Sequence, residues 1–203
     1  MSVSIKKTGI VQASGETGAN ICPDTSNLVA NYTYPSGNTY KDWFARTTSV
    51  IPSATNYVLS FWAKSTVNGD GVRAHYYSPN TTTTCTNSQG VTKTASDGNI
   101  DVTLSTEWKF YWIRYTQTET TAVKHLIFPR VFGSEYGSYG NGAKGSGVVS
   151  IKGLKFEEGT VPTAWIPCSA DADYVSSTSG FNEYLGNAQI TKGQVNAVDF
   201  IEI

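Results

Sequence analysis

Eight consecutive residues decide the fold class of this chain: Tyr57-Val58-Leu59-Ser60-Phe61-Trp62-Ala63-Lys64. Every second residue from Tyr57 to Ala63 is apolar, whereas the positions between them, from Val58 to Lys64, mix polar and apolar side chains. In an extended chain, alternate residues face opposite sides. The run therefore predicts a half-buried β-strand with one face in the core.

Further strands are predicted on both sides of this run. Residues 108–116 alternate in the same way, and both faces carry aromatic rings, so we expect a central strand that packs on one side and presents rings on the other. Shorter strands are predicted at 43–51, 72–77, 124–132 and 148–156. Glycine-containing turns such as 68–71, 97–99 and 158–160 separate them. Many short strands of this kind are typical of a β-sandwich or barrel.

The composition supports an all-β chain and excludes two classes of partner. Only 15% of the 203 residues are charged, and Ser, Thr, Asn, Gly and Tyr take their place, which favours strands and turns over long helices. The net charge of −1 gives no indication of nucleic-acid binding. No apolar run reaches the roughly 18 residues that membrane insertion needs.

Three cysteines, Cys22, Cys85 and Cys168, are too few and too scattered for a disulfide framework or a zinc site. We expect three buried thiols. A bond between Cys22 and Cys168 is the alternative, if the two ends of the domain meet.

Two polar stretches interrupt the strand pattern. Residues 80–99 are rich in threonine and predict an exposed loop or a long hairpin. Residues 133–147 are rich in glycine and serine and carry Tyr136 and Tyr139, which predicts a flexible loop. This loop is either a plain connection between strands or an adaptable contact loop, since binding loops favour the same residue types.

The two ends of the chain resemble each other. Ile5 to Ala13 and Ile190 to Ala197 each contain an isoleucine, a lysine-containing turn, a glycine, and an alanine four residues after that glycine. Both predict short β-hairpins, which are marginal alone and gain stability by pairing. We therefore expect assembly segments at 1–19 and 169–203, on either side of a β-sandwich at 20–168.

The stretch 149–167, which contains Leu154-Lys155-Phe156-Glu157-Glu158-Gly159 and then Thr163, Trp165 and Pro167, resembles the closing strand of a known family. The family comprises the carbohydrate-binding-module-like jelly rolls of bacteriophage tail fibres and minor structural proteins. Residues 27–28, 57–64 and 106–112 also resemble its motifs. The resemblance covers about residues 20–168 and implies a jelly-roll β-sandwich of the galactose-binding type. It implies nothing specific about the ligand, because fold does not dictate function.

No pattern in the chain predicts catalysis. A glycosidase needs two cooperating carboxylates, but the adjacent Glu157 and Glu158 face opposite sides of a strand. His75 and His125 lack the spacing of a metal pair. We therefore expect a binding protein and not an enzyme.

The candidate ligand-binding residues are aromatic and planar polar side chains, which suit sugars. They are Arg73, His75 and Tyr77 on one predicted strand, Trp112 and Arg114 on another, and Tyr136 and Tyr139 in the glycine-rich loop. Each could equally be an ordinary core or surface residue. The resemblance also implies a structural Ca²⁺, for which Asp24 and Glu157 are the candidate ligands.

We expect a non-catalytic phage or prophage fibre or appendage protein, located on the virion surface or otherwise extracellular. Its jelly roll would bind a bacterial surface glycan, and its terminal segments would form a homotrimer, because weak sugar sites gain affinity from multivalency. The alternative is a purely structural virion or decoration protein that binds other capsid or tail proteins. The binding module of a carbohydrate-active enzyme is a third, less favoured interpretation.

Overall fold

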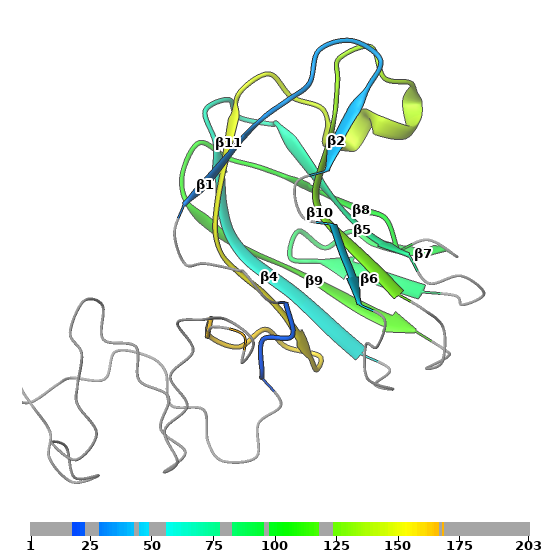
Figure 1. The fold of residues 1–203 in the computed structure, drawn as a ribbon, viewed down its shortest axis with the longest axis vertical. Helices are drawn as coiled ribbons and strands as arrows, with labels where there is room; N and C mark the ends of the chain where they lie inside the picture. The colour runs from blue at the N-terminus through cyan, green and yellow to red at the C-terminus, as the bar shows by residue number, and fades with distance from the viewer. Residues whose placement is uncertain are drawn as a thin grey trace, which may run out of the picture. The chain divides into compact units, whose positions relative to one another are not determined.

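The computed structural model describes residues 18–22, 29–42, 45–48, 56–77, 83–95, 98–117, 124–166 and 168 (Figure 1). Eleven β-strands and one short 3₁₀ helix lie in these ranges. The predicted terminal hairpins and Asp24 lie outside them, so the assembly segments and domain limits stay predictions. No helix in the described ranges is long and apolar enough to cross a membrane.

The strands form two antiparallel sheets. The first has six strands in the spatial order β1-β11-β4-β9-β6-β7. Their bounds are Ala30–Thr33 (β1), Val148–Glu158 (β11), Asn56–Ser65 (β4), Lys109–Gln117 (β9), Thr83–Asn87 (β6) and Thr92–Ala95 (β7).

The second sheet has five strands in the order β2-β10-β5-β8, with β3 also paired to β10. Their bounds are Tyr40–Asp42 (β2), Ala45–Thr48 (β3), Lys124–Phe132 (β10), Gly71–Tyr77 (β5) and Ile100–Thr103 (β8). The strand β10 contains a cis peptide bond before Pro129, and its register with β5 shifts between Ile127 and Arg130.

This strand order is that of a jelly roll, as predicted. The chain crosses to the opposite sheet at every connection except β2–β3 and β6–β7. The core strands β1-β11-β4-β9 thus face β2/β3-β10-β5-β8, which is the double Greek key arrangement of eight strands. The hairpin β6–β7 extends the first sheet beyond β9.

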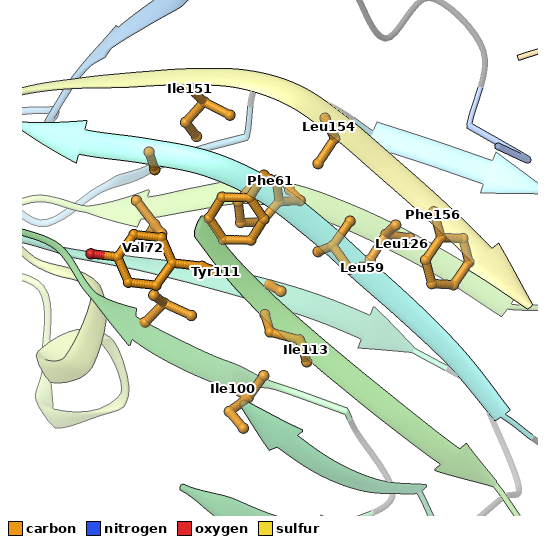
Figure 2. Close-up of a cluster of buried hydrophobic side chains, with 14 of the residues drawn as sticks. Leu59, Phe61, Val72, Ile100, Tyr111, Ile113, Leu126, Ile151, Leu154 and Phe156 are labelled. Atoms are coloured by element: carbon orange, nitrogen blue, oxygen red, sulfur yellow. The ribbon is translucent and has the colours of Figure 1, made fainter. Parts of the chain in front are cut away.

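The core lies between the sheets and combines aliphatic side chains with Phe and Tyr rings (Figure 2). From β4, Tyr57, Leu59, Phe61 and Ala63 are completely buried, which confirms the alternation predicted from sequence. The ring of Phe61 lies 4.4 Å from that of Phe128 on the opposite sheet. Each large apolar side chain buried in this way contributes about 1.5–3 kcal/mol.

The outer face of β4 and β11 is covered in part by the chain that follows β11. Val58 and Ser60 are buried although they point away from the core. Beside them, Trp165 donates its indole N–H to the carbonyl of Leu154 at 3.1 Å, which fixes the covering segment on the sheet. Trp165 therefore has a structural contact in this fold.

Several predicted boundaries and loops differ from the structure. The single strand predicted at 43–51 is replaced by β2 and β3, and β1 and β8 were not predicted. Residues 80–99 contain the hairpin β6–β7, one of the two predicted alternatives. The glycine-rich loop contains the 3₁₀ helix η1, Ser138–Ala143, which packs against β10, β5 and β8. All three cysteines are buried thiols, as expected.

Candidate functional site

Ten side chains gather on the outer surface of the second sheet and form what we call the arginine–aromatic face. Strand alternation places Val72, Ala74 and Tyr76 of β5 in the core, and consequently Arg73 and His75 on the opposite side. The face comprises Tyr40, Asp42, Arg73, His75, Asn99, Asp101, Arg130, Phe132, Tyr136 and Tyr139.

A row of four charged residues crosses this face in register. Asp42 of β2 lies opposite Arg130 of β10, which lies opposite Arg73 of β5, which lies opposite Asp101 of β8. The charges run negative, positive, positive, negative. Like charges directly opposite each other destabilise a sheet, so the two flanking aspartates are needed to neutralise the central arginines.

Each arginine makes a bidentate ion pair with its aspartate. Arg73 donates Nε–H and Nη2–H to Asp101 at 2.6 and 2.8 Å, and Arg130 donates the same groups to Asp42 at 2.6 and 2.9 Å. Burial alone would lower the pKa of both arginines, but the hydrogen bonds and charges of the aspartates outweigh it and raise the pKa. The guanidinium groups are therefore permanently charged and fixed in orientation.

Aromatic rings cover the two guanidinium groups. The Cζ of Arg73 lies 4.5 Å from the ring centroid of Tyr139 and 5.0 Å from that of Phe132. The Cζ of Arg130 lies 4.8 Å from the ring of Tyr40. Phe132 is the hub, since the rings of Tyr40, Tyr136 and Tyr139 lie within 6.0 Å of its own. Cation–π contacts of this kind bind the rings and the charged row into one unit.

A polar chain adds hydrogen-bonding groups at one edge. The amide nitrogen of Asn99 donates to the hydroxyl of Tyr139 at 2.7 Å, and its amide oxygen contacts Nδ1 of His75. The Tyr139 ring is thus held both by Arg73 and by Asn99. Its position is set by β5 and by the residue that precedes β8, and not by the loop alone.

The glycine-rich loop reaches the face because its backbone approaches the sheet closely. A Cβ atom at Gly142 would lie 2.0 Å from a carboxylate oxygen of Asp101, and one at Gly140 would lie 2.8 Å from the Phe132 ring. At the end of the loop, the carboxylate of Asp70 accepts hydrogen bonds from the backbone N–H groups of Ser146 and Gly147. These contacts seat the loop on the sheet, and its flexibility stays a prediction.

Two tyrosine rings remain open to solvent on this face. Tyr40 is 47% exposed and Tyr139 is 48% exposed, whereas the Arg73 side chain beneath is only 8% exposed. The Nη1 group of Arg73 is buried and has no hydrogen-bond partner among the described residues. The face therefore presents rings and carboxylate edges over a neutralised row of charge.

The structure brings four of the seven predicted ligand-binding residues together here: Arg73, His75, Tyr136 and Tyr139. Tyr77 ends β5, and its side chain lies outside the described part of the structure. Trp112 and Arg114 lie on β9, in the other sheet, and so do not join this group.

The carboxylate of Glu157, a predicted calcium ligand, lies in a closed buried network. It accepts hydrogen bonds from the backbone and hydroxyl of Thr163 at 2.7 and 2.5 Å and pairs with Lys155 at 2.9 Å. These hydrogen bonds and the ion pair satisfy the buried carboxylate of Glu157, so its burial needs no calcium ion. In the described residues, no group of three His, Cys, Asp or Glu side chains could hold a metal. Asp24 lies outside the description, so the calcium site stays a prediction.

Sequence reasoning missed the partners that complete the face: Tyr40, Asp42, Asn99, Asp101, Arg130 and Phe132. The available signal was alternation with apolar residues: Asn99 and Asp101 alternate with residues 100 and 102, and Arg130 and Phe132 flank Val131. Their convergence depends on cross-strand register, which alternation within one strand does not specify.

Comparison with known proteins gives distant likenesses. No family model and no curated protein matches the chain. A solved structure of a "putative sugar binding protein" from Bacteroides thetaiotaomicron is 12% identical, with 70% of this chain and 86% of that chain covered and a TM-score of 0.37. A structure of infectious bursal disease virus is 11% identical, with 68% of this chain and 35% of that chain covered and a TM-score of 0.17. Likenesses at these levels carry no information about the ligand.

Proposed function

We propose that this chain is a non-catalytic glycan-binding protein whose arginine–aromatic face takes a neutral bacterial surface saccharide. The observation that carries the proposal is the pairing of two exposed tyrosine rings with two bidentate Arg–Asp pairs on one sheet face. Aromatic rings stack against the C–H groups of a sugar, and fixed planar polar groups hydrogen-bond its hydroxyls.

The charge of the face supports a neutral ligand over an acidic one. The two arginines are neutralised by Asp42 and Asp101, whose carboxylates are 22% and 26% exposed while the guanidiniums are nearly buried. An acidic sugar would therefore approach carboxylate edges first and be repelled. A neutral polyhydroxyl ligand can instead donate hydrogen bonds from its hydroxyl groups to these carboxylate oxygens.

Preorganisation also supports binding. Tyr139 is held by Arg73 and Asn99, and the loop that carries it is seated on Asp101 through Gly142. Side chains fixed before the ligand arrives lose little conformational entropy on binding.

The biological setting belongs to the same proposal and is supported by the sequence resemblance alone. In it, the chain is part of a phage or prophage fibre or other appendage on the virion surface. Terminal segments would join three copies, and multivalency would strengthen a weak sugar site. Sedimentation of the full-length chain tests the assembly: a mass near three times 21.9 kDa is expected, and a monomer would contradict it.

The experiment for the ligand is a bacterial glycan array with the full-length chain, its Tyr139→Ala variant and its Phe110→Ala variant, with and without chelator. Phe110 is the matched control, because its ring is exposed to a similar degree but lies on the other sheet. We expect signal on neutral glycans that Tyr139→Ala loses and Phe110→Ala keeps. A blank array from folded protein would contradict the proposal and favour the purely structural virion role. Loss of signal with chelator would support the predicted calcium ion.

A further inference from the structure

A second group of side chains lies on the outer surface of the first sheet, the opposite side of the sandwich. It consists of Trp62 and Lys64 on β4, Phe110 on β9, Lys152 on β11, and Trp108, which precedes β9. We call it the tryptophan–lysine patch. Cross-strand pairing places Lys152, Trp62 and Phe110 in one row across three neighbouring strands.

The rings of the patch are exposed in the middle of a sheet. Trp62 is 42% exposed and Phe110 is 40% exposed, and their centroids lie 5.5 Å apart at an interplanar angle of 53°. Contiguous exposed apolar patches, above all when polar residues rim them, often mark binding surfaces. Elsewhere on this outer face, Val58 and Ser60 are buried, so the exposed rings lie beyond the part of the sheet that the described residues after β11 cover.

Two lysines converge on the third ring of the patch. The Nζ of Lys152 lies 4.9 Å from the Trp108 ring centroid, and the Nζ of Lys64 lies 5.4 Å from it. Neither lysine has an ion-pair partner among the described residues. This contrasts with the arginine–aromatic face, where each cation is matched by an aspartate. The patch therefore presents uncompensated positive charge beside aromatic rings.

The position of the patch within the sheet favours a saccharide over an extended peptide as its ligand. An extended peptide binds by adding a strand to a sheet edge, where backbone groups are available. The patch spans β11, β4 and β9, which are interior strands whose backbone groups pair with each other. Only ring faces, ammonium groups and neighbouring polar side chains are available there. One such group is the amide of Asn31, whose oxygen accepts a hydrogen bond from Ser150 at 2.7 Å in the row of Lys64.

We propose that the tryptophan–lysine patch is a second saccharide-binding site, selective for a sugar unit that carries a negative charge. Trp62 and Phe110 stack against the sugar ring, and Lys64 and Lys152 pair with its anionic group. The site is independent of the neutral-glycan site, since it lies on the other sheet and carries uncompensated positive charge, whereas the charges of the arginine–aromatic face are paired.

The test uses an oligogalacturonate, a carboxylate-bearing saccharide, and its carboxyl-reduced neutral counterpart, with the full-length chain in calorimetric titrations. We expect binding of the acidic oligomer that weakens about tenfold or more in Trp62→Ala and severalfold in Lys152→Gln. Binding should fall as salt rises, because exposed charges are screened. Lys109→Gln is the matched control, because it also removes the charge of an exposed lysine. Lys109 is next to Phe110 in sequence but lies opposite the core residue Ala63, so it does not belong to the patch.

Three outcomes would overturn the proposal. They are no binding of the oligogalacturonate, equal binding of its neutral counterpart, or equal losses in Lys152→Gln and Lys109→Gln. Polyglutamate of similar length is the final arm, and binding as tight as that of the saccharide would assign the patch to acidic peptides instead. Lys152→Gln leaves the aromatic rings and the sheet intact. It therefore still tests the proposal if Trp62→Ala fails to fold. A failed neutral-glycan array would not affect these results.

Discussion

Replacing Glu157 with glutamine tests how the buried end of the first sheet is held together. Lys155 and Glu157 are both completely buried, and their side chains pair at 2.9 Å. The amide of glutamine can still accept the hydrogen bond that the backbone N–H of Thr163 donates. Glu157→Gln therefore removes the charge and keeps the shape, which leaves the Lys155 ammonium buried without its carboxylate.

The size of the loss can be worked out from Lys155. Removing one partner of a buried pair costs about 3–5 kcal/mol. The ammonium can also escape this cost by losing its proton. The ordinary pKa of a lysine, 10.5, lies about 3.5 units above pH 7. Removing the proton at pH 7 costs about 1.36 kcal/mol for each of these units. Proton release therefore limits the cost of the unpaired Lys155 charge to about 5 kcal/mol.

The pH dependence of the variant provides a second signature. Burial lowers the pKa of Lys155 in the folded chain, and the charge of Glu157 offsets part of this effect. In Glu157→Gln the folded pKa falls further, while the unfolded value stays near 10.5. Between the two values the unfolded chain binds more protons, so the free energy of unfolding rises with pH, by up to about 1.4 kcal/mol per pH unit.

Urea denaturation of the wild type, Glu157→Gln and Glu158→Gln would measure this effect. Glu158 is the matched control, because it is the next residue of β11 and is exposed; its variant should stay within about 0.5 kcal/mol of the wild type. Lys155→Met combined with Glu157→Gln should recover most of the lost stability. A loss below about 1 kcal/mol for Glu157→Gln would refute this account of the pair. Equal losses in both glutamine variants, or a loss reproduced by adding chelator to the wild type, would also refute it.

Two further predictions concern the loop and the core. Gly142→Ala should displace the loop from Asp101, lower the free energy of unfolding by about 1–3 kcal/mol and weaken neutral-glycan binding in titrations. Gly137→Ala is the control, because a Cβ atom there meets nothing within 4 Å, and it should change neither stability nor binding. Burial raises the pKa of Tyr76 and Tyr115 well above 10, so the stability present below pH 10 should fall above it, by about 1.4 kcal/mol per pH unit for each tyrosine. Urea titrations from about pH 9 to about pH 12 would check this, and an unchanged midpoint would contradict it.

The long strands could be predicted from the sequence because their core faces carry large apolar side chains. From Tyr57 to Ala63, alternation alone gave the buried face correctly. The strand β6 was not predicted as such, because its inward positions are Thr83, Cys85 and Asn87, which resemble a polar loop. Asn87 is buried because its amide donates a hydrogen bond to the carbonyl of Asp101, a contact that no local pattern indicates.

The outer faces of the sheets were harder to predict, because their burial depends on other parts of the chain. Lys155 and Glu157 are charged and lie on an outward face, yet the segment containing Thr163 buries both. The same limit applies to the candidate site. Alternation put Arg73 and His75 on one face, but their partners come from strands whose register the sequence does not state.

The central claim is that the arginine–aromatic face binds a neutral glycan, and it is tested most directly by calorimetric titration of the neutral glycan selected on the array. The account predicts that Tyr40→Ala and Tyr139→Ala each weaken binding about tenfold or more, equivalent to about 1.4 kcal/mol, while Phe110→Ala binds like the wild type. Equal affinity of the wild type and both tyrosine variants, with all chains folded, would contradict the claim.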